Sequence, residues 1–245
     1  SHTFSLEDSP KAYDMILARE EPFAGIVIAY EQKEDIKKSV ELRNIDYKAE
    51  DANVGFIGAG SFAQGFLLPN MKGYCNFIGV ATGRGNTAKY VGDKYGFNYL
   101  ADSGEEIVKD SKINTVFITT RHNLHTENVL KSIHNNKHVF VEKPLAMNEE
   151  ELNEIKTAYD ETDKKHVMVG FNRRFSPAVQ ELKKVFLKPQ KKSILIRVNS
   201  GVMPVDHWVN DPEIGGGRII GEGCHFIDLA MFLADSRIVS VSADA

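Results

Sequence analysis

One apolar run of this 245-residue sequence ends in side chains that can exchange protons. Residues 139–141 are followed by Glu142, Lys143 and Pro144. Pro144 disfavours helical dihedral angles at Lys143, so we expect the amine at the tip of a strand. The tertiary amide also makes a cis Lys143–Pro144 bond accessible. A lysine held in this way is a candidate acid or base for catalysis, whereas its structural interpretation is a surface lysine at a strand end.

A second apolar run ends in Thr119, Thr120, Arg121, His122 and, one turn later, His125. Ligands of open parallel sheets bind beyond the carboxyl ends of the strands. We therefore expect both segments to border one ligand site. The two histidines have no cysteine or acidic partner at ligand spacing, so no metal is expected.

A glycine-rich turn follows the apolar run 54–57, with the spacing Gly58-x-Gly60-x-x-Ala63. In the dinucleotide-binding fingerprint, the first glycine permits a tight turn and the second admits a pyrophosphate. The third small residue lets the helix, which opens with Ser61 and Phe62, lie close to the strand. The helix amino terminus would then face the phosphates. A purely structural glycine turn is the alternative.

The next predicted strand ends in Thr82, Gly83 and Arg84, without a carboxylate. An acid at this place binds the ribose 2′-hydroxyl of NAD, whereas a nearby arginine accommodates the 2′-phosphate of NADP. The sequence therefore favours NADP over NAD. The alternative is that Arg84 is a solvated loop residue.

These segments lie within a regular alternation of predicted strands and helices. This alternation predicts parallel βαβ units. The fold class is α/β, a Rossmann-type doubly wound parallel sheet followed by a truncated second α/β (α+β) domain. We place the Rossmann domain at 52–165 and the second domain at 166–245. The predicted strands are 54–57, 76–81, 114–119, 138–142 and 167–170, and the helices between them are 61–71, 86–95, 124–133 and 149–160. The second domain is predicted to contain helices 177–186 and 222–234 and strands 193–200 and 238–242.

The first fifty residues differ in character. A helix is predicted at 6–20 and a buried type of strand at 24–30. Residues 31–51 are highly charged and are expected to form a solvated linker with a marginal helix. The opening Ser1-His2-Thr3 has no initiator methionine, which suggests an excerpt from a longer chain.

Composition excludes several classes of protein. Hydrophobic content of 42%, charged content of 26% and a net charge of −4 are typical of a globular protein without a nucleic-acid surface. Cys75 and Cys224 are too few for a disulfide framework, and no apolar run is long enough for a membrane span. We expect a cytoplasmic protein.

From about Asn53 onward the sequence resembles the glucose–fructose oxidoreductase/inositol dehydrogenase (Gfo/Idh/MocA) family. The family motifs occur in order: the glycine fingerprint, Thr120-x-x-x-x-His125, Glu142-Lys143-Pro144, Gly170-Phe-Asn-Arg-Arg-Phe175 and Gly223-x-His225-x-x-Asp228. The resemblance implies NAD(P) as cofactor, a sugar or cyclitol as substrate, and an open sheet in the second domain that often mediates oligomers.

The resemblance also implies residue roles. Lys143 would hydrogen-bond the reacting oxygen and His225 would be the catalytic histidine, while Asn172 and Arg173 would approach the substrate or nicotinamide. Glu142 would support the lysine near the cofactor. For His225 the structural alternative is a core histidine. The implied cofactor-binding residues are Gly58, Gly60, Ser61, Phe62, Ala63, Thr82, Arg84, Thr119, Thr120, Arg121, His125, Glu142 and Lys143.

The sequence departs from the family pattern at Gly221, where many members have an aspartate four positions before the histidine. This puts the proton relay in doubt. Asp228, one turn after His225, could orient the imidazole or serve only the helix. Arg121 replaces a common proline, and Trp208 would either wall the substrate pocket or cap the sheet.

Residues 3–30 resemble the C-terminal end of zinc-type, medium-chain alcohol dehydrogenases, through the segments 4–13 and 25–28. Together the two resemblances imply a fragment of a bi-domain oxidoreductase. The expected function is hydride transfer to or from a sugar, cyclitol or nucleotide-sugar. The alternatives are a non-catalytic nucleotide-binding or assembly module, and a module that has lost nucleotide binding. Open edges at 193–200 and 238–242 would make the protein a homo-oligomer.

Overall fold

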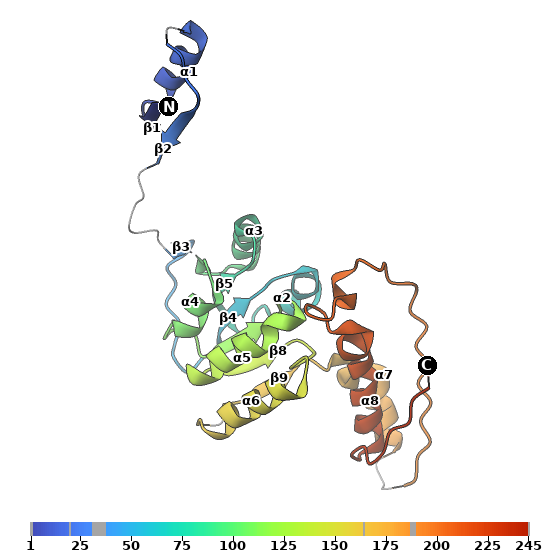
Figure 1. Cartoon of the computed structure of the whole chain (residues 1–245). Helices are drawn as coiled ribbons and strands as arrows, with labels where there is room; N and C mark the ends of the chain where they lie inside the picture. The colour runs from blue at the N-terminus through green and yellow to red at the C-terminus, as the bar shows by residue number, and fades with distance from the viewer. Residues whose placement is uncertain (1, 20, 31–37, 164, 187–189, 245) are drawn as a thin grey trace. The chain divides into compact units, whose positions relative to one another are not determined.

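The computed structural model describes the whole chain except residues 1, 20, 31–37, 164, 187–189 and 245. The chain divides into two units, 1–37 and 38–245 (Figure 1).

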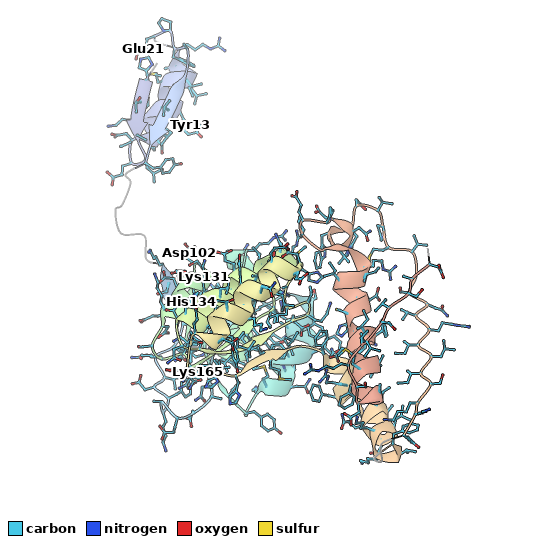
Figure 2. All side chains as sticks on the ribbon, turned by 60° about the horizontal axis from the view of Figure 1, so that its bottom comes forward. Tyr13, Glu21, Asp102, Lys131, His134 and Lys165 are labelled. Carbon is cyan, nitrogen blue, oxygen red and sulfur yellow. The ribbon has the colours of Figure 1, made fainter. Side chains whose placement is uncertain are left out.

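The first unit is a small βαβ element. Its parts are β1 (His2–Ser5), α1 (Ser9–Ala18) and β2 (Ile26–Ala29), and the two strands pair in parallel. Ala12 is buried, but no other side chain described in this unit is. Val27 on β2 is 56% exposed and Tyr13, labelled in Figure 2, is 67% exposed. The prediction of a buried strand is therefore wrong, because two strands and one helix cannot cover both faces of the sheet.

The second unit is built on a seven-stranded sheet with the order β3-β6-β5-β4-β7-β8-β9. All neighbouring strands are parallel except β3, which runs antiparallel to β6. Leaving β3 aside, the strand order is that of the Rossmann fold, as predicted. The strands are β3 (Ser39–Glu41), β4 (Asn53–Ile57), β5 (Asn76–Ala81), β6 (Tyr99–Ala101), β7 (Thr115–Ile118), β8 (His138–Val141) and β9 (Val167–Val169).

Alternate strand residues point to opposite sides of this sheet, so apolar side chains project from both faces, and helices cover both. On one face η1 (Ala63–Leu67), α2 (Leu68–Met71) and α3 (Gly85–Tyr95) enclose a cluster that includes Phe56, Phe77 and Phe97. On the other face α4 (Gly104–Lys109), α5 (His125–His134) and α6 (Glu149–Asp160) lie over Val116, Ile118 and Val139. α5 buries Ser132 and Ile133 and leaves His134, labelled in Figure 2, exposed. Burial of each large apolar side chain contributes about 1.5–3 kcal/mol.

The charged segment before the Rossmann domain is partly structured. β3 lies within the stretch for which a linker with a marginal helix was predicted, and it forms the sheet edge beside β6. The Asn98 amide donates to the Ile45 carbonyl (2.7 Å), and the Arg43 guanidinium donates to the Phe97 carbonyl (3.0 Å). The prediction is wrong at 39–41 because backbone pairing with β6, rather than apolar anchors, holds this segment. Residues 31–37 lie outside the described part of the chain.

After β9, the regular secondary structure described in the C-terminal part is helical. It contains η3 (Asn172–Phe175), α7 (Pro177–Val185), η4 (Trp208–Asn210), η5 (Ile219–Gly223) and α8 (Cys224–Ala234). Residues 193–200 and 238–242, predicted as strands, belong to no sheet in the described structure. Their alternating pattern is typical of strands, but a strand needs a partner for its backbone hydrogen bonds. Leu195 (89%) and Val239 (97%) are exposed as a result.

No helix in the described ranges is both long and apolar enough to cross a membrane.

Candidate active site

The glycine turn after β4 is held between three strands. Gly58 has φ +86°, and a Cβ atom there would lie 2.7 Å from the Thr119 carbonyl oxygen. Its N–H donates to the Ala81 carbonyl at the end of β5 (2.8 Å), while its own carbonyl accepts from the Thr119 hydroxyl (2.9 Å). Position 58 therefore requires glycine for both backbone and steric reasons. Thr119 supports the turn from β7.

The helix that follows leaves space above its first residues. A Cβ atom on Gly60 would meet no atom within 4 Å. Ser61 and Phe62 are exposed, while Ala63 is 1% exposed and packs beneath the turn. A helix amino terminus with open space in front of its amides suits a phosphate group. The residues present therefore fit a dinucleotide.

The turn after β5 is organised by Thr82, whose hydroxyl donates to the Arg84 carbonyl (2.7 Å). The Arg84 side chain is exposed and forms no ion pair with any residue that the structure describes. Its guanidinium is thus available to a ligand.

His125, predicted as a cofactor contact, is fully buried, so its ring lies in the core beneath the predicted cofactor site and not on its surface. Its Nδ1 lies 2.7 Å from the Pro144 carbonyl oxygen and its Nε2 lies 3.2 Å from the Thr120 carbonyl oxygen. Burial lowers the pKa of this imidazole. The ring connects the turn after β7 to the turn after β8, and therefore positions both of them.

Lys143 follows β8 through a Lys143–Pro144 peptide bond that is cis. Its half-buried ammonium group donates to the backbone carbonyl of Gly221 in η5 (2.6 Å). Neighbouring Glu142 packs against Gly170, where an added Cβ would lie 2.9 Å from the carboxylate Oε1. Burial raises the pKa of the Glu142 carboxyl group.

His225 lies near the start of α8 and is 9% exposed. Its Nδ1 is buried and has no hydrogen-bond partner among the described residues. Burial, followed by the positive charges of Lys143 and Arg173, lowers the pKa of this imidazole to about 4. The ring is therefore neutral at pH 7. A buried polar atom without a partner is the kind of group that a ligand satisfies.

Asp228 does not orient the His225 imidazole. Both of its carboxylate oxygens accept from Arg174 instead, with the Arg174 Nε at 2.9 Å. This pair joins η3 to α8, so the structural interpretation of Asp228 is the correct one. Arg173 and Asn172 are exposed on η3, and the Arg173 guanidinium lies 4.4 Å from the centre of the Phe226 ring.

Residues 52–171 match the sequence model of the Gfo/Idh/MocA oxidoreductase family, which is characterised by an NAD-binding Rossmann fold. These residues belong to that family. The glycine turn and the tip of β8 described above lie within the matched range.

The relatives span most of this chain. It is 32% identical to inositol 2-dehydrogenase of Serratia proteamaculans, over 77% of the chain and 56% of that protein. Among solved structures it resembles a levoglucosan dehydrogenase in complex with NADH and levoglucosan (TM-score 0.60, 25% identity, 74% of this chain and 53% of that one). It also has the fold of a 3-ketoreductase from Actinomadura kijaniata in complex with NADP (TM-score 0.62, 18% identity, 75% and 57%). The chain thus spans about half the length of the relatives that it matches.

The sequence placed His122 at a strand end that borders the ligand site and left Trp208 either in the wall of the substrate pocket or at the cap of the sheet, but it gave neither a contact with the other. His122 is 5% exposed, and its Nδ1 lies 2.8 Å from the Gly215 carbonyl oxygen. The Trp208 ring packs edge-on against it, with 4.8 Å between ring centres. The feature of the sequence that could have predicted this contact is the glycine run 215–217. A Cβ at Gly215 would lie 2.4 Å from the Val209 Cα, so the backbone of this loop must pack closely.

Among the residues with described positions, no three His, Cys, Asp or Glu side chains are grouped to hold a metal ion.

Proposed function

We propose that this chain is part of an NAD(P)-dependent oxidoreductase that transfers a hydride to or from a sugar, cyclitol or nucleotide-sugar. The observation that carries the proposal is the neighbourhood of Lys143. Its amine reaches η5, and its positive charge acts on the imidazole of His225, whose Nδ1 has no partner among the described residues. The glycine turn lies at the end of β4, two strands away from β8 in the parallel part of the same sheet. The inositol and levoglucosan dehydrogenases named above support a polyhydroxylated substrate.

In this proposal a bound nicotinamide supplies the hydride acceptor. Gly58 and Gly60 shape the turn that holds the pyrophosphate, and the helix after this turn begins with Ser61 and Phe62. Thr120 and Arg121, after β7, border the same cofactor site. Glu142 supports the adjoining lysine.

Oxidation of a carbinol also releases the hydroxyl proton, which a nearby base must accept. Neutral His225 has an unpartnered ring nitrogen for this proton. The Lys143 ammonium donates a hydrogen bond to the reacting oxygen and stabilises its developing negative charge. Arg173 and Asn172 contact the rest of the substrate.

We propose a preference for NADP over NAD. The turn after β5 offers Thr82 and Arg84 and no carboxylate, which suits a 2′-phosphate. Titration of the Arg84→Ala variant tests this preference. NADPH affinity should fall at least about tenfold and NADH affinity should stay within about twofold.

The rival proposal is a non-catalytic nucleotide-binding or assembly module. Gly221 favours it, because it supplies a backbone carbonyl to Lys143 where the family resemblance implies an acid. The two proposals are separated by titrating the complete protein with NADH and NADPH, and by screening inositols, sugars and sugar nucleotides for reduction of the bound cofactor. Binding with turnover supports the enzyme, binding without turnover supports the module, and no saturable binding overturns both.

We also propose that the complete protein self-associates through residues 193–200 and 238–242. Their apolar side chains, such as Leu195 and Val239, are exposed. Light scattering that shows a monomer at every concentration would contradict this.

For the first unit we propose an origin in an alcohol-dehydrogenase-like module of a bi-domain protein. Its apolar side chains, among them Leu17 (80%) and Tyr13, are exposed, which supports the proposal that the rest of such a module would bury them. If so, residues 1–37 expressed alone should be unfolded by circular dichroism, and a stable isolated fold would contradict the proposal.

A further inference from the structure

His122 is fixed in one place by its surroundings. A carbonyl oxygen only accepts, so the 2.8 Å contact to the Gly215 carbonyl puts the hydrogen of this imidazole on Nδ1. Trp208 covers the ring from one side, and the Arg121 guanidinium lies 5.6 Å from the centre of the tryptophan ring. The imidazole therefore cannot turn away without losing both the hydrogen bond and the aromatic contact.

Gly221 lies against the same ring. A Cβ atom on Gly221 would be 2.9 Å from His122 Cε1 and 3.5 Å from Nδ1. Real Cβ atoms essentially never approach to less than 3.0 Å, so a side chain at 221 would have to displace either the ring or η5. The imidazole thus occupies the volume that a side chain at position 221 would need.

The backbone of Gly221 holds Lys143. Its carbonyl accepts the ammonium hydrogen bond at 2.6 Å, and it belongs to the π-helical turn η5 that leads into α8 and His225. A shift of η5 by a few tenths of an ångström would lengthen this bond and move His225 as well. The ring–glycine contact therefore acts on both proposed catalytic side chains.

We infer that His122 and Gly221 form a matched pair which sets the distance between the turn after β7 and η5, and that His122 is a positioning residue for the Lys143 amine, because the same residue of η5 accepts the hydrogen bond of that amine. The ring acts as a spacer against the bare Cα of Gly221. It keeps the carbonyl within hydrogen-bond reach of Lys143. This inference rests on the proposed function for its effect on turnover, but the packing itself does not depend on a cofactor.

The test is a double-mutant cycle in the complete protein with His122→Ala, Gly221→Ala and the double variant. We expect Gly221→Ala to lower kcat about tenfold or more, because its Cβ meets the ring. In the double variant the ring is absent, so kcat should exceed that of Gly221→Ala. NAD(P)H affinity should stay within about twofold throughout. If the loss of kcat in the double variant equals the combined losses of the two single variants, the inference of a matched pair is overturned.

A second readout needs neither cofactor nor substrate. The rate at which an amine-specific reagent labels Lys143, followed by mass spectrometry, reports how well the amine is held. We expect faster labelling in both single variants and partial recovery in the double variant. Unchanged labelling in both single variants would overturn the inference. If the wild type neither binds nor oxidises anything while the labelling cycle behaves as expected, the proposed function fails and the pairing stands.

If His122→Ala fails to fold, His122→Asn takes its place in the cycle. The shorter amide keeps a donor for the Gly215 carbonyl but leaves the Gly221 side of the ring site open. Combined with Gly221→Ala, it should recover labelling and melting temperature relative to Gly221→Ala alone. The exposed neighbour Asn123, changed to alanine, is the matched control and should leave labelling unchanged.

Discussion

The ammonium of Lys143 donates a 2.6 Å hydrogen bond to the backbone carbonyl of Gly221, 78 residues further along the chain. A backbone carbonyl orients the amine without adding a negative charge. A carboxylate at this place would instead form an ion pair with it. The proposed site therefore keeps a positive charge available for a developing alkoxide.

Replacing Lys143 by methionine should abolish most of the turnover. The variant keeps the aliphatic stem but loses the donor to the reacting oxygen, so kcat/KM should fall about 10²- to 10⁴-fold. NAD(P)H affinity, measured by fluorescence titration, should change little. Lys109→Met on α4, whose side chain is exposed, is the control and should behave like the wild type. Undiminished turnover in Lys143→Met would remove the lysine from the mechanism.

The two glycines of the turn should respond differently to alanine. Gly58→Ala places a Cβ against the Thr119 carbonyl at a positive φ, and should lower the free energy of unfolding by about 1–3 kcal/mol. Gly60→Ala meets no protein atom, so stability should hold while NAD(P)H affinity falls about tenfold or more.

Urea unfolding and cofactor titration separate these effects. Gly65→Ala, in open space on the same helix, is the control for both and should be neutral or slightly stabilising. Unchanged cofactor affinity in Gly60→Ala would mean that the pyrophosphate lies elsewhere.

Asp228→Asn should destabilise the protein without altering the pH dependence of turnover. The carboxylate is 10% exposed and pairs with Arg174, so removal of its charge should cost about 1–3 kcal/mol in urea unfolding. Asp235→Asn is the matched control, because that carboxylate is 84% exposed and its contact to Lys183 is 3.6 Å; its effect should be below about 1 kcal/mol. A shifted pH profile at unchanged stability would restore Asp228 as the partner of His225.

Stability should decrease on acidification. The pKa values of His122 and His225 are lowered by burial from 6.5 to about 4 each. Between these limits the unfolded chain binds more protons than the folded one, so the free energy of unfolding falls as pH falls from about 6.5 to 4. Each extra proton contributes about 1.4 kcal/mol per pH unit.

The raised pKa of Glu142 acts in the opposite direction, because the folded state then binds the additional proton. Melting temperatures between pH 7.5 and 4.5 give the net slope. His225→Asn should flatten it, and an unchanged slope in that variant would show that the imidazole titrates normally.

Local sequence was sufficient for the glycine turn and for five of the seven strands of the sheet, but it predicted neither β3 nor β6. The conformations that Gly58 adopts depend on its own missing Cβ, and the alternation of apolar runs with helical patterns is a property of neighbouring residues. Parallel crossovers allow few arrangements of such units, and apart from β3 the observed order is that of the predicted Rossmann-type sheet.

Tertiary structure decided which groups meet. Asp228 is close in sequence to His225 but pairs with Arg174, and His125 lies in the core although its spacing fits a ligand-binding turn. The runs 193–200 and 238–242 have a strand pattern and no partner among the described residues, whereas the charged segment 39–41 has one. The physical reason is common to all of these: a hydrogen bond or a packed ring requires two groups to meet in space, and the type and spacing of neighbouring residues specify only one of them.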